Sequence, residues 1–449
     1  MSKNFKIAAA ISGMALLIIA GRFYALKNEK TAPAFPKFDK RAAEIVPSSE
    51  FLNAQKAVEY YETEIRRKPE AAKNYIELAQ VFLQEARVTG NHHQYIPDVQ
   101  ELLDQALSLE PENFQALVIK ASLMMTLHQF QEAKRLAQIA IARAPYNAFS
   151  HAVLTDALIE LGEYGEAVKA CDKMLSIHPD LRSYARASYL RELHGDLDGA
   201  IAAMRMACDA GVAGQENRAW ALHQLGMLYL QQGKADTAAF IFKGILEERP
   251  NYAYTIAGLA QIGNVKKNYT EAIALFQQAY KIVPDHGFIE QLADLHRAAG
   301  KFSLADSTAR EVLKTFGQHE QGGWNINREF AMFCANHDMN LAAALKRAKS
   351  EYEARPNNID VLETYAWALY KNGQVQHAVP LIERAMNLNA RRATLSYRAG
   401  MIYFAANQRE KAKTHLQRSL AENLYLHPLY VAEAQQTLSK ITTNKYAMK

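Results

Sequence analysis

Residues 219–252 read AWALHQLGMLYLQQGKADTAAFIFKGILEERPNY, and this 34-residue stretch decides the fold. Its first half spaces apolar residues as an amphipathic helix does, a tight turn follows at Gly233, and a second helix then runs to Pro250. Similar turn motifs, each ending in alanine, recur at intervals of 33 or 34 residues with two longer intervals of 38 and 39. The alanines are Ala133, Ala167, Ala200, Ala238, Ala272, Ala305, Ala344, Ala378 and Ala412. This period predicts an array of helix–turn–helix units.

The residue types at fixed positions of the repeat have physical reasons. Glycine at the turn adopts the left-handed conformation that ends a helix, and we expect this of Gly162, Gly195, Gly233, Gly300 and Gly373. Asp196 and Asn268 follow at N-cap positions, and Glu271 forms a capping-box-like pair with Asn268. Alanine lets the second helix approach the first closely. Proline, which cannot continue a helix, ends the second helix at Pro69, Pro111, Pro145, Pro179, Pro250, Pro284 and Pro356.

At these residues the chain resembles the tetratricopeptide repeat family, whose 34-residue unit is a helix–turn–helix. The resemblance covers about residues 72–426, some ten units, after a partial copy at Phe51–Pro69 and before a helix at about Leu429–Ile441. It implies an all-α fold, an α-solenoid wound as a right-handed superhelix, in which each unit contacts only its neighbours. The best copy matches the family at Leu225, Gly226, Tyr229, Gly233, Ala238, Phe242 and Pro250.

Four segments divide the chain. We expect an apolar anchor or signal at 1–28, an extended Lys/Pro-rich spacer at 29–50, the solenoid at 51–426, and a C-terminal capping helix and tail at 427–449. Extra residues interrupt the period near 88–97, 211–218 and 318–323, and we expect them to lengthen loops or shift the superhelical pitch. The first of these insertions is expected to be a loop that contains His92 and His93.

The N-terminal segment holds an uncharged run, Ile7–Gly21, behind Lys3 and Lys6. Counted on to Leu26 it is long enough for a transmembrane helix, and a signal-peptide core fits equally well. The positive residues that follow the run favour a cytoplasmic body, whereas the small basic head favours export. We expect a membrane-anchored chain with a periplasmic or other extracytoplasmic body; a cytoplasmic body and a cleaved, secreted chain remain open.

Charge and motifs exclude several function classes. The net charge of +5 comes from residues 1–41, which hold eight Lys/Arg against two acids, so the rest of the chain is nearly neutral and has no nucleic-acid footprint. No nucleotide-binding, hydrolase, metalloprotease or calcium-loop motif occurs. Cys171 and Cys208 are expected to be small buried hydrophobes. We therefore expect no enzyme, no cofactor, no metal site and no small-molecule substrate.

The resemblance also implies which side chains face the concave groove. They form two candidate partner-binding clusters, because aromatic and arginine side chains commonly anchor protein recognition. The first comprises Arg186, Tyr189, Trp220, His223 and Tyr254, and the second Trp367, Tyr370, Tyr397 and Arg398. Phe149, Asp156, Arg182 and Phe404 occupy groove positions too. The same positions can instead pack between adjacent units. The carboxylate clamp of chaperone-binding members is not reproduced, since its positions here are Gln80, Ser122 and Asp156.

These observations predict a membrane-tethered scaffold in a bacterial cell envelope, which holds an extended segment or a helix of a partner protein in its groove. One alternative is an accessory subunit of an export or polysaccharide-secretion complex. Another is an enzyme with an unrecognised site.

Overall fold

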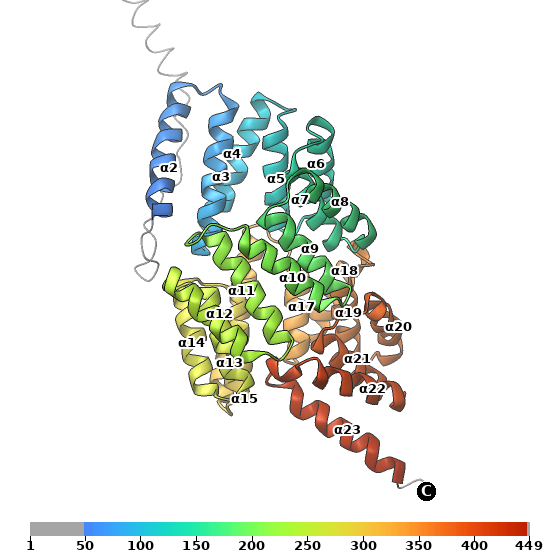
Figure 1. Ribbon diagram of the computed structural model, residues 1–449. Coiled ribbons are helices and arrows are strands. Elements are labelled where there is room, and N and C mark those ends of the chain that lie inside the picture. The colour runs from blue at the N-terminus through green and yellow to red at the C-terminus, as the bar shows by residue number, and fades with distance from the viewer. Residues whose placement is uncertain (1–48, 447–449) are drawn as a thin grey trace, which may run out of the picture.

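The computed structural model describes residues 49–446, which form 22 α-helices and two short 3-10 helices (Figure 1). Twenty helices make ten units of two. The first helices are α3 (Ala72–Thr89), α5 (Phe114–Thr126), α7 (Ala148–Glu160), α9 (Leu181–Leu193), α11 (Glu216–Gln231), α13 (Ala253–Val265), α15 (His286–Ala298), α17 (Asn327–Asn336), α19 (Ile359–Lys371) and α21 (Ala393–Ala405). The second helices are α4 (His92–Leu109), α6 (Phe130–Arg143), α8 (Tyr164–Ile177), α10 (Leu197–Asp209), α12 (Ala235–Glu248), α14 (Tyr269–Ile282), α16 (Phe302–Gln321), α18 (Leu341–Ala354), α20 (Val375–Ala385) and α22 (Arg409–Ala421). Single helices, α2 (Ser49–Arg67) and α23 (Tyr430–Tyr446), flank the array.

The turns confirm the predicted helix boundaries. The five turn glycines have φ between 72° and 80°, and in three other units His128, Lys267 and Asn407 take the same conformation at 57–59°. All seven predicted prolines lie two residues beyond the last residue of a helix, as Pro145 follows α6. The repeat alanines are at most 1% exposed, as expected where two helices approach closely. Asp196 and Asn268 cap α10 and α14 through their side chains.

Two of the three insertions do not form the expected loops. Helix α4 begins at His92, so the expectation of a loop containing His92 and His93 was wrong. The extra residues instead lengthen α3 and α4 to 18 residues each, and those near 318 extend α16 to 20 residues. In a longer helix the backbone N–H and C=O groups of the extra residues bond to each other, whereas in a loop they would depend on water. The insertion near 211–218 is a loop that ends where α11 begins at Glu216.

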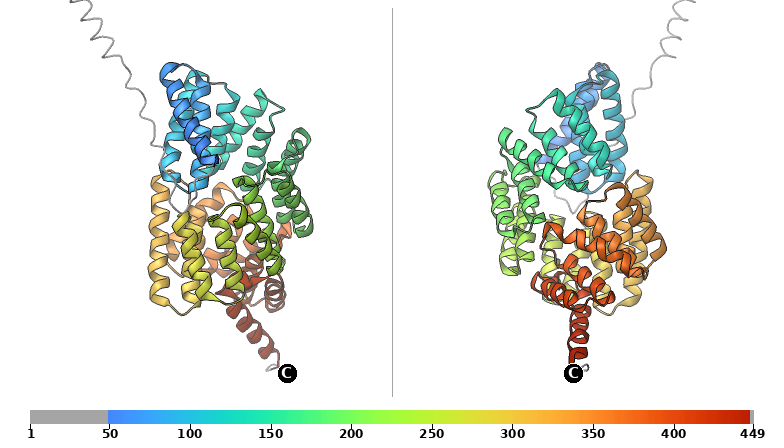
Figure 2. Two further views of the ribbon diagram at one scale, coloured as in Figure 1. Left: turned by 60° about the vertical axis from the view of Figure 1, so that its left-hand side comes forward. Right: turned by 90° about the vertical axis from the view of Figure 1, so that its right-hand side faces the viewer.

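The described part of the solenoid winds back on itself. Figure 2 shows the blue and teal units stacked against the yellow and orange ones. In each of units 1–5 (residues 72–248), the end of the first helix or the turn after it contacts a connection that follows one of units 6–10 (residues 253–421). The partners are Gly90 and Val283, Leu127 and Asn325, Glu160 and Asn358, Gly195 and Asn389, and Leu230 and Asn423, all 193 to 198 residues apart. The expectation that each unit contacts only its neighbours was therefore wrong.

These contacts between the superhelical turns satisfy helix ends. The last carbonyls of a helix lack partners within that helix. At the end of α7 the Asn358 side chain donates to the Ile159 and Glu160 carbonyls (3.3 and 3.0 Å), while its own oxygen caps α19 by accepting from the Val361 N–H (3.0 Å). The Asn423 side chain likewise donates to the Leu230 carbonyl of α11 (2.6 Å). Each of these asparagines thus joins two turns of the superhelix, at positions that lie more than five units apart in the sequence.

The N-terminal anchor predicted at 1–28 and the spacer up to residue 48 lie outside the described residues. Within residues 49–446, no helix combines the length and the apolar character needed to cross a lipid bilayer.

Candidate functional site

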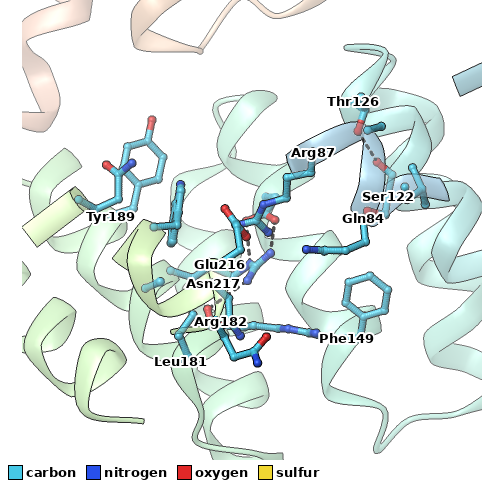
Figure 3. Close-up of a pocket in the computed structure, with 18 of the residues that line it drawn as sticks. Gln84, Arg87, Ser122, Thr126, Phe149, Leu181, Arg182, Tyr189, Glu216 and Asn217 are labelled. Carbon is cyan, nitrogen blue, oxygen red and sulfur yellow. Dashed lines mark hydrogen bonds and ion pairs between the residues drawn. The ribbon is translucent and has the colours of Figure 1, made fainter. Parts of the chain in front are cut away.

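A cavity with a volume of about 1130 Å³ lies inside the first superhelical turn (Figure 3). Its walls are mainly the first helices of units 1–5, namely α3, α5, α7, α9 and α11. Arg87 of α3 closes the ring: its guanidinium lies 3.2 Å from the Glu216 carboxylate of α11 and 5.8 Å from the centre of the Trp220 ring. The cavity is therefore surrounded by five units.

Helix α9 supplies the charged wall. Asp180 caps its start in a reciprocal pair with Ser183: the Asp180 side chain accepts from the Ser183 N–H (2.9 Å), and the Ser183 hydroxyl accepts from the Asp180 N–H (2.8 Å). The Arg186 guanidinium then donates two hydrogen bonds to the Asp156 carboxylate of α7 (2.9 and 2.6 Å), which fixes its plane. Tyr189 lines the cavity and is 40% exposed, and burial raises the pKa of its hydroxyl. Tyr189 is therefore available as a hydrogen-bond donor.

The other walls are polar and uncharged or aromatic. Amide and hydroxyl side chains face the cavity from several helices: Gln80, Gln84, Ser122, Thr126, Gln215, Asn217 and Gln224. In Figure 3 Gln84 and Phe149 border the same space as Arg182, whose guanidinium lies 5.7 Å from the centre of the Phe149 ring. The three positions of the absent carboxylate clamp, Gln80, Ser122 and Asp156, do line the cavity. Such a surface offers hydrogen bonds and flat apolar area together.

Comparison with known proteins agrees with this architecture. Models of the tetratricopeptide repeat family match residues 223–286 and 395–423, at the helix pairs α11–α14 and α21–α22. The chain is a tetratricopeptide repeat protein. Members of the family are generally non-catalytic scaffolds for protein–protein interaction.

Two curated relatives of this tetratricopeptide repeat protein share part of its length. Anaphase-promoting complex subunit 3 of Schizosaccharomyces pombe is 22% identical over 184 residues, which is 41% of this chain and 27% of the relative. Cellulose synthase operon protein C of Pseudomonas fluorescens is 28% identical over 160 residues, 34% of this chain and 12% of the relative. The chain thus spans about a quarter or less of either relative.

Solved structures with a similar course include the human IFIT1 dimer with PPP-AAAA, at 16% identity and a TM-score of 0.46, covering 76% of this chain and 79% of that one. The APC/C hetero-tetramer Cut9–Hcn1 matches at 13% identity and a TM-score of 0.39, covering 88% and 96%.

The structure brings together three residues of the first predicted cluster. Arg186, Tyr189 and Trp220 line the cavity of the repeat protein, whereas His223 and Tyr254 do not. His223 stacks on Phe242 of the same unit with ring centres 5.5 Å apart, and burial lowers its pKa to about 4, so it is a neutral packing residue between α11 and α12. Tyr254 borders a separate, smaller cavity of about 190 Å³. Neither side chain lines the cavity, because rings of successive units pack on one another: the ring centres of His223 and Tyr254 lie 6.4 Å apart, and those of Tyr254 and Phe288 lie 5.6 Å apart.

The second predicted cluster is part of the protein interior. Trp367, Tyr397 and Arg398 are at most 5% exposed. The Trp367 indole N–H donates to the Asn336 side chain (3.0 Å), and Tyr370 stacks on Trp367 with ring centres 4.8 Å apart. The Arg398 guanidinium is paired with the Glu363 carboxylate, as a buried charge requires. These four residues therefore fill the space between units and do not offer an open groove.

Outside the cavity, the described residues hold no metal-ligand cluster and three separate cysteines. Within residues 49–446, no group of three or more His, Cys, Asp or Glu side chains is arranged to hold a metal ion. The three cysteines are buried as separate thiols, and burial raises the pKa of Cys171 and Cys334 to about 11 and that of Cys208 to about 12. The buried, inert state expected for Cys171 and Cys208 is thus confirmed.

One acidic region stands out on α15. Burial together with neighbouring carboxylates raises the pKa of Glu290 to about 8, and burial raises that of Asp294 to about 7. These two carboxyl groups carry less negative charge at neutral pH than their sequence implies.

Sequence reasoning missed Arg87, Gln84 and Glu216. The ion pair of Arg87 and Glu216 joins residues 129 positions apart. No local pattern marks such a pair, because it depends on how tightly the superhelix closes.

Proposed function

We propose that this tetratricopeptide repeat protein is a membrane-tethered scaffold that binds an extended segment of a partner protein in the cavity of units 1–5. The observation that carries the proposal is the convergence of Trp220, Tyr189 and Arg186, from two helices, on one enclosed space of about 1130 Å³. Buried aromatic and arginine side chains are the most frequent energetic anchors of protein interfaces.

The walls favour an extended segment over a helix. An extended chain exposes its backbone N–H and C=O groups, and the amide side chains Gln84, Gln224 and Asn217 can pair with them, whereas a helix has already satisfied its own. A helix with side chains is also about 10–12 Å across. The closure of the ring by Arg87 and Glu216 favours the thinner ligand.

The decisive test is a cavity triple variant, Arg186→Ala, Tyr189→Ala and Trp220→Ala. Cells that carry the tagged full chain are crosslinked, the protein is purified in detergent, and co-eluting proteins are identified by mass spectrometry. We expect recovery of a specific partner to fall at least about tenfold in the triple variant, because truncating interface anchors commonly costs 2 kcal/mol or more each. Helicity should be unchanged, and melting is measured beside it, because Arg186→Ala leaves the Asp156 carboxylate without its ion-pair partner.

A matched control removes two aromatic residues and one arginine outside the cavity, by Tyr146→Ala, Phe240→Ala and Arg310→Ala. Tyr146 and Phe240 are 78% and 80% exposed and border no part of the cavity. This control should retain the partner. Retention by both triple variants would move the site away from the cavity.

The location of the scaffold rests on the sequence. The run Ile7–Gly21 behind a small basic head supports tethering through residues 1–28, with the body outside the cytoplasm of a bacterial cell. The likeness to cellulose synthase operon protein C favours a second candidate, an accessory subunit of a polysaccharide-secretion complex. Both candidates use the repeats as a protein-binding scaffold.

A membrane-impermeant maleimide distinguishes the two sides of the membrane. Because the three native cysteines are buried, the wild-type protein should label slowly in intact cells and serves as the background. Asp236→Cys places a thiol where the native side chain is fully exposed, at 101%. We expect labelling of this variant in intact cells, at several times the wild-type level. Labelling only after lysis would place the body in the cytoplasm.

A further inference from the structure

Two charged side chains in the cavity, those of Arg182 and Glu192, make no ion pair within the part of the chain that the structure describes. The other ionic side chains on its walls are paired, Arg186 with Asp156 and Arg87 with Glu216. Arg182 and Glu192 also line the cavity, yet within the described residues neither side chain makes an ion pair or a hydrogen bond. The Arg182 guanidinium contacts the Phe149 ring, and burial raises the pKa of Glu192 although the charge of Arg392 opposes this. A ligand that supplied both missing charges would gain free energy at both places.

The two groups lie at a fixed separation. Both belong to α9, ten positions apart, which is about 15 Å along a straight helix. Tyr189 and the Arg186–Asp156 pair lie between them. In Figure 3 the side chains of Arg182 and Phe149 border one side of the cavity and Tyr189 lies on another. An extended segment advances about 3.3 Å per residue, so it spans this separation in four to five residues.

We propose that the cavity selects partner segments that carry one acidic and one basic residue four or five positions apart. The acidic side chain pairs with Arg182 and the basic side chain with Glu192. Either order along the partner fits, because an extended segment can enter in either direction. This inference rests on the proposed function and adds to it the charge pattern of the partner.

Selection from random twelve-residue peptides displayed on phage tests this pattern on the full chain in detergent. We expect acid–base pairs at spacings of four and five to be enriched about tenfold over the input, whereas pairs at spacings of one and eight should not be. The cavity triple variant should abolish the enrichment. Peptides that bind the wild-type protein but not the cavity triple variant, and that show no preferred spacing of charges, would overturn this inference and leave the proposed function intact.

Charge-reversal variants provide a gain of binding that an unfolded protein cannot imitate. Glu192→Lys should switch the selected pattern to two acidic residues at the same spacing, and Arg182→Glu should switch it to two basic residues. An unchanged pattern in both variants would overturn the assignment of these two side chains. The absence of any cavity-dependent peptide would overturn the proposed function as well. Binding of cellohexaose in place of peptides would also overturn the proposed function, because the cavity would then be a carbohydrate site. It is measured as a change in tryptophan fluorescence that Trp220→Phe abolishes.

Discussion

Replacing Arg355 with alanine is expected to lower the free energy of unfolding by about 3–5 kcal/mol, because it leaves a buried carboxylate without its cation. The side chains of Arg355 and Glu351 are only 6% and 4% exposed, with a guanidinium-to-carboxylate distance of 2.7 Å. Arg355 also donates to the Glu160 side chain (2.9 Å) across the contact between superhelical turns, and its guanidinium lies 4.6 Å from the centre of the Phe130 ring. Urea denaturation measures the loss, and small-angle X-ray scattering should detect a larger radius of gyration as the two turns separate.

The control for this prediction lies on the same helix. Lys349 and Glu353 of α18 are also four residues apart, at 3.7 Å, but their side chains are 62% and 65% exposed. Lys349→Ala should change the free energy of unfolding by less than about 0.5 kcal/mol, as is usual for exposed pairs. Equal effects of the two substitutions would contradict the contact between turns as the structure has it.

Gly162→Ala is expected to cost about 3 kcal/mol, from two sources. The residue has φ = 76°, where any side chain strains the backbone. A Cβ atom there would also lie 2.3–2.6 Å from the backbone of Asn357 and Asn358, which belongs to the other superhelical turn. Backbone atoms cannot move aside as a flexible side chain can, so we expect the contact at α7 to open. Chemical denaturation measures the cost, and faster amide exchange at the Val361 N–H would locate it.

Gly233 provides the matched substitution at the same position of another unit. Its φ is 80°, but no atom lies within 4 Å of a Cβ placed there. Gly233→Ala should therefore show the backbone strain alone, about 1 kcal/mol. If Gly162→Ala cost no more than Gly233→Ala, the close approach between turns would not exist in solution.

The repeat pattern predicted the local structure well. Helix boundaries follow from residue types that act on their immediate neighbours, such as Gly233 at a left-handed turn and Pro145 beyond a helix end. The nearly invariant burial of the repeat alanines has the same local origin, because the two helices of one unit are adjacent in sequence. The local prediction was wrong at the insertion near His92, where the added residues extend two helices and form no loop.

The candidate site was predicted only in part. Position within the unit placed Arg186, Tyr189 and Trp220 on the inner surface, where the structure has them. The same rule misplaced His223, Tyr254 and the Trp367–Arg398 cluster. Whether an inner side chain is free depends on the rings in the next unit, as the 5.6 Å between the ring centres of Tyr254 and Phe288 shows.

The array of ten helix pairs follows from the sequence alone, because each helix start, stop and close approach depends on residues within one 34-residue unit. The closing of the solenoid on itself, and the cavity that results, depend on tertiary contacts. Small rotations between units add up along the array. Two contacts hold the superhelix closed, Arg87 with Glu216 and Asn358 with the end of α7. Each joins residues more than a hundred positions apart. No pattern within a single repeat specifies them.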